Sequence, residues 1–171
     1  MVILYIRHAK DREGNYLHDE KLTKEGKYEA FDLTKNLIEE YGLPDIIYYS
    51  PFYRVRQTRK VMMKVISKYK KENNIKKEVV LILEPRLGRF FTRNQSKYPD
   101  VRESTFRKGA IIEERSREFK ERVEEQLNQI QNIDKNIWNI THSLVILHVA
   151  RLSDINRSSH VNYLDVCVVK K

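Results

Sequence analysis

The sequence has a single cysteine, Cys167, so no disulfide bond can form within the chain. It therefore gives no indication of an oxidising compartment. No stretch reaches the ~20 consecutive apolar residues of a membrane span. The strand-like N-terminus also lacks the basic start and cleavage region of a signal peptide. These absences predict a cytoplasmic protein with no membrane association.

Glycine is scarce as well, with five in 171 residues. None of them forms the glycine-rich loop that cradles nucleotide phosphates, which excludes a nucleotide P-loop. Three of the five histidines, His18, His148 and His160, have no spacing that makes a metal site. We therefore expect no metal and no cofactor.

The residues that are present indicate a folded globular protein. Hydrophobic residues make up 40% of the chain and include 10 tyrosines, which excludes a mainly disordered chain even though 33% of residues are charged. The length is most simply that of one domain over residues 1–171, large enough to bury a core.

The net charge of +9 points to anionic partners such as phosphorylated metabolites, phosphoprotein or nucleic acid. The excess is concentrated in residues 52–78, which hold ten lysines and arginines against two glutamates. A helix there would place Arg56, Lys60, Lys64 and Lys68 on one stripe. This stripe is either an ordinary solvated helix face or a surface that steers an anionic macromolecule such as RNA.

Hydrophobic patterning predicts an α/β fold in which strands and helices alternate around a parallel sheet. Predicted strands cover residues 2–6, 45–49, 78–83, 137–141 and 163–169. Predicted helices run from Thr23 to Tyr41, through the basic segment after Pro51, over 112–133 and over 144–152. Between about 84 and 112 the periodicity is lost, which marks an irregular lid or specificity segment.

Three predicted strands end in polar residues: Arg7-His8, Ser50 to Arg54, and Thr141-His142. Because parallel strands present their carboxyl ends at one edge of a sheet, these residues are expected to meet there. Two arginines and two histidines would form a cationic pocket for a phosphoryl group. The simpler alternatives are an Arg-His pair of no significance in a basic chain, and a His142 that is merely satisfied at a strand end.

Four motifs in order carry a resemblance to a known family: Arg7-His8-Ala9, Leu22 to Gly26, Ser50 to Thr58, and Thr141 to Ser143. On these motifs the sequence resembles the histidine phosphatase superfamily, also called phosphoglycerate mutase-like. The resemblance implies a three-layer α/β/α sandwich with a mostly parallel central sheet. Arg-His-Ala-Lys is most similar to the motif of the small phosphohistidine phosphatases.

The resemblance implies that His8 is a nucleophile that forms a transient phosphohistidine, with Arg7, Arg54 and His142 binding the phosphoryl oxygens. A neutral imidazole is a competent nucleophile near pH 7, and guanidinium groups suit phosphoryl oxygens. Further substrate contacts are expected from Lys10, Asn15, Arg89 and Ser143. The other arginines of the irregular segment either widen this pocket toward a polyanionic substrate or are solvated loop charge.

The general acid of the family is missing from both positions where it usually stands, because these align with Arg89 and Ser143. Glu84 is the nearest candidate in sequence, and Asp11, Glu13, Asp19 and Glu103 are others. Alternatively the leaving group needs little protonation, or the chain is a pseudoenzyme that only binds phosphate. An alcohol leaving group without an acid would cost roughly 10²–10⁴ in rate, which argues against an efficient mutase.

The expected function is therefore a metal-independent phosphatase acting on a phosphomonoester or phosphohistidine, with a phosphohistidine intermediate on His8. One alternative is a weak or inactive member that binds phosphoprotein or RNA through its basic surface. Another is a phosphoglycerate mutase-type phosphotransferase.

Overall fold

The computed structural model describes residues 1–12, 21–90, 114–157 and 159–170, which include a five-stranded sheet. The strands are β1 (Val2–Arg7), β2 (Ile46–Tyr49), β3 (Val80–Leu83), β4 (Ile137–Thr141) and β5 (Val166–Lys170), in the spatial order β3-β2-β4-β1-β5. The first four are parallel, whereas β5 pairs antiparallel with β1. This confirms the mostly parallel sheet.

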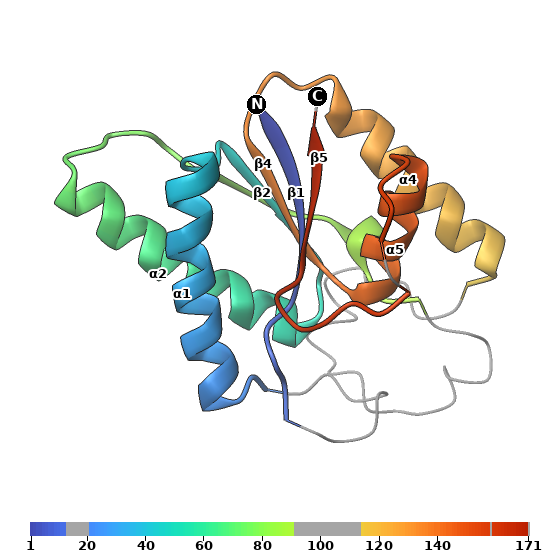
Figure 1. Cartoon of the computed structure of the whole chain (residues 1–171), viewed down its shortest axis with the longest axis horizontal. Coiled ribbons are helices and arrows are strands. Elements are labelled where there is room, and N and C mark those ends of the chain that lie inside the picture. Colours follow the sequence, from blue (N-terminus) through green and yellow to red (C-terminus); the bar gives the residue numbers. More distant parts are fainter. Residues whose placement is uncertain (13–20, 91–113, 158, 171) are drawn as a thin grey trace.

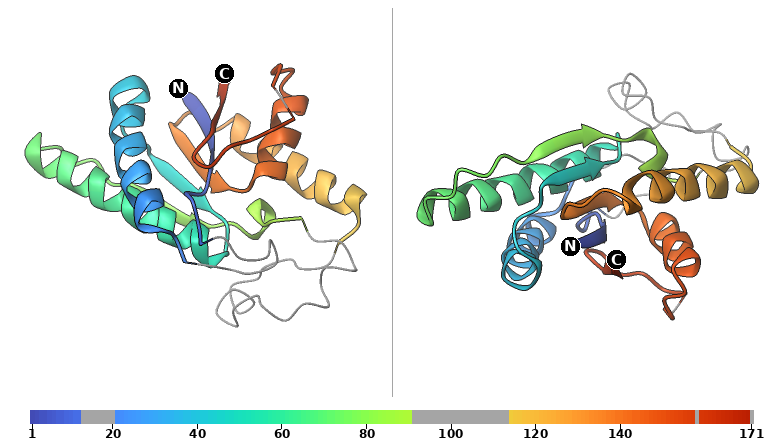
Figure 2. Two further views of the ribbon diagram at one scale, coloured as in Figure 1. Left: turned by 60° about the horizontal axis from the view of Figure 1, so that its bottom comes forward. Right: turned by 90° about the horizontal axis from the view of Figure 1, so that it is seen from above.

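Helices cover both faces of this sheet, which gives the three layers expected (Figures 1 and 2). The helices α1 (Lys24–Tyr41) and α2 (Tyr53–Glu72) lie on one face. The helices α4 (Ser116–Gln131) and α5 (Ser143–Leu152) lie on the other, together with the short 3₁₀ turn η1 (Pro85–Leu87). All the described helices and strands belong to or pack on this one sheet. That residues 1–171 form a single domain stays a prediction.

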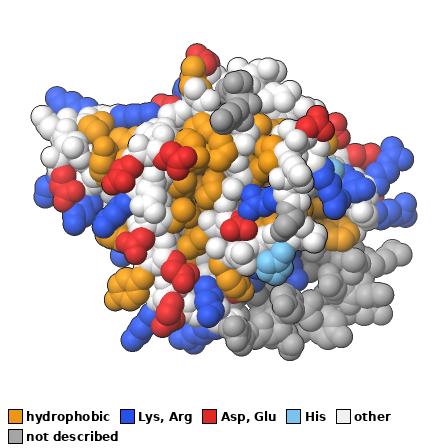
Figure 3. Space-filling view, in the orientation of Figure 1, with side chains coloured by type: hydrophobic (Ala, Val, Ile, Leu, Met, Phe, Trp, Pro, Cys, Tyr) orange, Lys and Arg blue, Asp and Glu red, His pale blue; other side chains and the backbone are white. Residues whose placement is uncertain are grey.

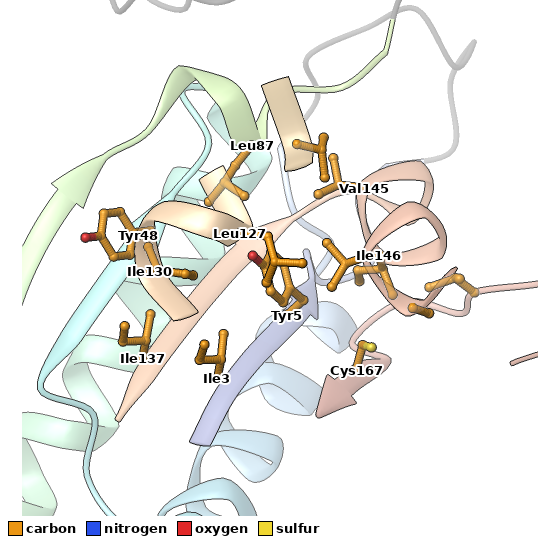
Figure 4. Packing of buried hydrophobic residues seen from close by; sticks show 14 of the residues in the cluster. Ile3, Tyr5, Tyr48, Leu87, Leu127, Ile130, Ile137, Val145, Ile146 and Cys167 are labelled. Carbon is orange, nitrogen blue, oxygen red and sulfur yellow. The ribbon is translucent and has the colours of Figure 1, made fainter. Parts of the chain in front are cut away.

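Alternating residues of β1 supply the two halves of the core, as the two-residue period of a strand requires. Leu4 and Ile6 pack with α1 and α2, whereas Ile3 and Tyr5 pack with α4 and α5. Figure 4 shows the second cluster, in which Tyr5 lies among side chains from α4 and α5. Because both faces of β1 are buried, the residues that follow its carboxyl end are held in a fixed position.

The ends of α1 lie where its sequence signals predict them. The Thr23 side chain accepts a 2.9 Å hydrogen bond from the Gly26 N–H, so it caps the first turn. At the other end Gly42 has φ 76°, in the left-handed region that favours glycine, and its N–H donates to the Ile38 carbonyl. Both predicted boundaries are confirmed.

Gly26 also lets α1 approach the chain that follows β1. A Cβ atom at this position would lie 2.4 Å from the Lys10 carbonyl oxygen and 2.8 Å from the Lys10 nitrogen. Both are backbone atoms, so neither can turn away as a side chain would. Glycine at position 26 therefore fixes the helix directly against the segment that carries His8.

We expect Gly26→Ala to lower the free energy of unfolding by about 1–3 kcal/mol, the usual cost of overpacking. Helix propensity alone predicts the opposite sign, a gain of about 1 kcal/mol for alanine over glycine. Urea denaturation measures the change, and Asn36→Ala at an exposed position of α1 is the control for propensity. A more stable Gly26→Ala protein would show that the close approach is unimportant.

Three predicted boundaries are wrong. The last strand begins at Val166 rather than at 163, because the Asp165 carboxylate accepts from the Asn162 N–H at 2.8 Å and closes a turn. Helix α4 begins at Ser116, and residue 114, within the range predicted as helix, is not helical. The third strand begins at Val80 rather than at 78, and it lies at the sheet edge with Val80 exposed. Most of the predicted lid, residues 91–112, lies outside the described residues.

The surface is mixed in character. Figure 3 shows hydrophobic side chains across the middle of the face that it draws, and lysine and arginine side chains toward both ends of the molecule, including the end where α2 ends. Lys70 and Lys71 supply charge in the last turn of that helix. In the described part of the chain, we find no helix both long and apolar enough to cross a membrane.

Candidate active site

The carboxyl ends of β1, β2 and β4 meet as predicted, and backbone hydrogen bonds join the residues that follow them. The His8 N–H donates to the Thr141 carbonyl at 3.0 Å, and the Ser50 N–H donates to the Ile140 carbonyl at 3.1 Å. The rings of His8 and His142 are consequently 5.2 Å apart between centroids, in an edge arrangement. The parallel register therefore brings two histidines from opposite ends of the sequence into contact.

His8 is oriented by its own backbone. Its Nδ1 lies 2.9 Å from the Ala9 carbonyl oxygen. Because a carbonyl only accepts hydrogen bonds, Nδ1 carries the proton and Nε2 carries the free lone pair. Ala9 is itself fixed, since its N–H donates to Thr58 Oγ1 at 3.1 Å.

The environment keeps the His8 ring neutral. Burial lowers its pKa well below the ordinary value, and the charges of Arg54, Arg7 and Arg89 lower the pKa further. The hydrogen bond to Ala9 acts in the opposite direction and is outweighed. At neutral pH His8 is therefore a buried, neutral imidazole surrounded by cations, which is the form that can act as a nucleophile.

His142 is neutral for similar reasons. Its pKa is well below the ordinary value because of burial first, and then because of the positive charge of Arg54. Its Nε2 lies 3.1 Å from Ser50 Oγ, and the Phe52 ring meets it edge-on at 5.0 Å between centroids. Helix α5 begins directly after His142, so the positive end of that helix dipole also lies at the site.

Arg54 lies in the first turn of α2 and is buried. Its Nη1 donates to Asp11 Oδ2 at 3.1 Å. Thr58 joins this turn to the His8 loop, because its hydroxyl donates to the Arg54 carbonyl at 2.9 Å while accepting from Ala9. Arg54 therefore occupies a defined position next to both histidines.

Arg7 is positioned by Tyr163. The guanidinium carbon lies 4.1 Å from the centre of the Tyr163 ring, and Nη1 donates to the Val161 carbonyl. The Tyr163 ring also lies 5.7 Å from the His8 ring, and its hydroxyl donates to Asp11 Oδ1 at 3.0 Å. Leu164, the next residue, has φ 60°, an unfavourable left-handed conformation that the turn before β5 maintains.

The remaining predicted site residues are placed unequally. The charge of Arg89 acts on both histidines, so this side chain lies near the site. Lys10 is half-buried beside Gly26, and Ser143 is half-buried as the first residue of α5. Asn15 lies outside the described residues.

Glu84, the favoured sequence candidate for the acid, is engaged elsewhere. Its Oε1 accepts from Arg86 Nε at 2.9 Å and from the Arg86 N–H at 3.0 Å, and its Oε2 accepts from Arg86 Nη2 at 2.7 Å. Its charge acts on Tyr5 and Tyr48, and it is not among the groups that shift the pKa of His8 or His142. The structure therefore does not bring Glu84 together with the two histidines.

The sequence patterns assign no role to Tyr163, Ser50 and Thr58, and they offer Asp11 as only one of several carboxylates that could be the general acid. Ser50 and Thr58 belong to a motif that matched the family, which was a signal for them. No such signal marks Tyr163, because this residue falls within the strand predicted over 163–169. Its contact with Arg7 joins residues 156 positions apart, and local pattern does not reveal such a contact.

Solved structures with similar coordinates decide the fold. A scan of family models and a search of curated proteins find no match to the sequence. Ecdysone phosphate phosphatase from Bombyx mori, solved with tungstate, matches with a TM-score of 0.71 and 14% identity over 98% of this chain and 88% of that one. The chain has the histidine phosphatase fold.

Two further structures of this fold match over 98% of the chain and 86% of their own length. Phosphoglycerate mutase from Bacillus anthracis has a TM-score of 0.64 and 15% identity. The protein histidine phosphatase SixA, solved with tungstate, has a TM-score of 0.65 and 16% identity. The fold that the sequence motifs implied is thereby confirmed.

Within this histidine phosphatase fold, the described residues contain no group of three or more histidine, cysteine, aspartate or glutamate side chains placed to hold a metal ion. The charged groups around His8 are instead mostly cationic, and Asp11 is paired with Arg54. This donor set suits a phosphoryl group better than it suits a cation.

The two neutral histidines predict a pH-dependent stability. Since the folded-state pKa values lie below the unfolded value of about 6.5, the unfolded chain binds more protons below that pH. The contribution of these two neutral histidines to the free energy of unfolding is fully present above pH 6.5. It is lost as the pH falls toward their folded-state pKa values. The slope is up to about 1.4 kcal/mol per pH unit for each histidine.

Denaturation between pH 7.5 and 5.5 measures this effect, and His142→Gln is expected to make the slope less steep. A free energy of unfolding that stays constant over this interval would contradict the burial of two neutral histidines.

Proposed function

We propose that this protein is a phosphatase that transfers a phosphoryl group to His8 Nε2 and then to water, without a metal ion. The observation that carries the proposal is the state of His8: neutral, fixed through Nδ1 by the Ala9 carbonyl, and surrounded by the charges of Arg7, Arg54 and Arg89. A nucleophile and a set of phosphate-binding groups are thus supplied together.

In the first step, Arg7 and Arg54 bind the phosphoryl oxygens. His142 donates a hydrogen bond to one of these oxygens or helps to orient the phosphoryl group. The Nε2 lone pair of His8 forms a bond to phosphorus as the bond to the leaving group breaks, and that electron pair departs with the leaving group. The guanidinium groups stabilise the charge that spreads over the equatorial oxygens. Nδ1 keeps its proton and its bond to Ala9.

In the second step, water attacks phosphorus and the bond between phosphorus and His8 Nε2 breaks. The electron pair returns to Nε2, one proton leaves the attacking water, and inorganic phosphate is released. The cationic ring formed in the first step is a good leaving group, and its return to the neutral form agrees with the low pKa of His8.

The structural relatives support this reading at the level of the fold. Two of them were solved with tungstate, a tetrahedral oxyanion, and both are named as phosphatases. With 14% and 16% identity they do not specify a substrate for this chain. Phosphomonoesters and phosphohistidine are both proposed, because neither needs recognition beyond the phosphoryl pocket. The cytoplasmic location also stays a prediction.

Phosphate release from an aryl phosphate and from a phosphohistidine peptide tests the function. We expect turnover on at least one of them, unchanged after treatment with a chelator. Loss of turnover on chelation would contradict the metal-free mechanism. No turnover on either substrate between pH 5 and 8 would favour a phosphate-binding protein without catalysis.

The basic stripe on α2 supports a second candidate, binding of an anionic macromolecule. Lys60, Lys64 and Lys68 are exposed on this helix, as predicted, and Lys68 lies 3.7 Å from Glu72. An RNA or phosphoprotein contact here would weaken steeply as salt is raised. RNA binding no tighter than that of a generic basic protein at moderate ionic strength would remove this candidate.

A further inference from the structure

Asp11 is a buried carboxylate beside Arg54, one of the residues proposed to bind the phosphoryl group. The residue is 9% exposed, and both of its oxygens are engaged. Oδ2 accepts from Arg54 Nη1 at 3.1 Å, and Oδ1 accepts from the Tyr163 hydroxyl at 3.0 Å. Burying a carboxylate beside a phosphate-binding arginine reduces the positive charge of the site, so a purely electrostatic phosphate trap would not need it.

The backbone at Asp11 is also fixed. Asp11 forms an isolated antiparallel bridge with Leu22, and the Arg12 N–H donates to the Lys21 carbonyl at 3.0 Å. Lys10, on the other side, packs against Gly26 at the start of α1. The carboxylate is therefore presented by a segment braced on both sides.

Each contact of Asp11 leads to a group that binds phosphate or lies against the nucleophile. Arg54 comes from α2, and Tyr163 from the turn before β5 packs on both Arg7 and His8. Among the described residues, the side-chain hydrogen bonds of Asp11 go to Arg54 and Tyr163 and not to His8. Asp11 is thus linked to Arg54 directly and, through Tyr163, to Arg7 and His8, so this carboxylate borders the place where a phosphoryl group held by these residues would lie.

We propose that Asp11 is the general acid that protonates the leaving group, a proposal that rests on the phosphatase function above. A phosphoryl dianion bound to Arg54 competes for that guanidinium and places negative charge beside Asp11. Proximity of like charges favours the protonated carboxyl.

The proton balance then closes over the two steps. As the bond between phosphorus and the leaving oxygen breaks, protonated Asp11 donates its proton to that oxygen and becomes a carboxylate. In the second step the carboxylate accepts the proton of the attacking water, and Asp11 is protonated again. The Tyr163 hydroxyl holds Oδ1, and it stays protonated because burial and Asp11 raise the pKa of Tyr163.

Asp11→Asn tests this assignment, because asparagine keeps the size of the side chain and a carbonyl acceptor but cannot donate an acidic proton. The substrates are aryl phosphates graded by the acidity of the phenol. For the most acidic phenol, kcat/KM of Asp11→Asn is expected to stay within a few-fold of the wild type. As the phenol becomes less acidic, the loss should grow to about 10²-fold or more.

Two variants serve as matched comparisons. Tyr163→Phe keeps the ring on Arg7 and removes only the hydroxyl on Asp11, so it should show a smaller loss that also grows as the phenol becomes less acidic. Asp45→Asn removes a carboxylate that is paired with Lys77 at 2.8 Å outside the site. The ratio of its kcat/KM to that of the wild type should be the same for every aryl phosphate.

An Asp11→Asn protein that loses the same factor on every aryl phosphate would overturn the proposal, because Asp11 would then act only by positioning Arg54. No loss on any substrate would overturn it too. Leaving-group dependence in Glu84→Gln instead of Asp11→Asn would assign the acid to Glu84. If the wild type releases phosphate neither from aryl phosphates nor from the phosphohistidine peptide, the proposed function fails and this assignment fails with it. Turnover of the phosphohistidine peptide with no hydrolysis of any aryl phosphate would overturn the assignment alone and leave the proposed function standing.

Discussion

A His8→Ala protein is expected to release phosphate at least about 10³-fold more slowly than the wild type, since removal of a nucleophile leaves only binding and electrostatic contributions. The loss should appear in kcat on every substrate, whatever its leaving group. It should not be accompanied by unfolding, because β1 and the core on both sides of it do not depend on the imidazole.

His148→Gln is the matched control for this variant. His148 lies on α5, half-buried, with its ring 6.1 Å from that of Phe119, and the charges that act on it are those of Lys120, Glu124 and Arg151. We expect its kcat to be close to that of the wild type. A His8→Ala protein that is folded by circular dichroism and retains most of its turnover would contradict the proposed mechanism.

The second large effect concerns stability. Arg122→Leu is expected to lower the free energy of unfolding by about 3–5 kcal/mol, because it leaves the buried Glu114 carboxylate without its counter-ion. Arg122 Nε donates to Glu114 Oε2 at 2.6 Å, and Nη2 donates to Glu114 Oε1 at 2.5 Å. Arg122 also donates to the carbonyls of Arg86 and Gly88, so it joins the described residues on either side of 91–113.

Two comparisons separate burial from charge. Arg117→Leu, on the same helix, breaks the exposed pair with Glu121, and its effect should be close to the error of measurement. The double variant Arg122→Leu with Glu114→Leu should recover much of the loss, because no uncompensated charge is then buried. Equal stability losses in Arg122→Leu and Arg117→Leu would contradict the buried pair.

Much of the site geometry was predictable from sequence, because it follows from strand ends. The motif residues Arg7, His8 and His142 stand next to apolar runs long enough to be strands, and parallel pairing then requires these strand ends to meet. The boundaries of α1 were predictable for a comparable reason, since Thr23 and Gly42 act on their own helix.

The remaining features depend on contacts between distant residues. The sequence does not distinguish Asp11 from Glu84 as candidates for the general acid, because the difference lies in their partners. Asp11 is paired with Arg54 at the site, whereas Glu84 is paired with Arg86. Tyr163 was assigned to a strand because its neighbours are apolar enough for one. The Asp165 carboxylate, which accepts from the Asn162 N–H, closes a turn there instead and leaves Tyr163 free to stack on Arg7.

The most direct test of the account is to trap the phosphoryl group on the enzyme. Rapid acid-free quenching during turnover of a radiolabelled substrate, followed by peptide mapping, measures which residue carries the label. We predict an acid-labile, alkali-stable phosphoryl group on the peptide that contains His8, and no label in His8→Ala. Sustained turnover with label on a different residue, or with no label on His8 under conditions where hydrolysis of the intermediate limits the rate, would contradict nucleophilic catalysis by His8.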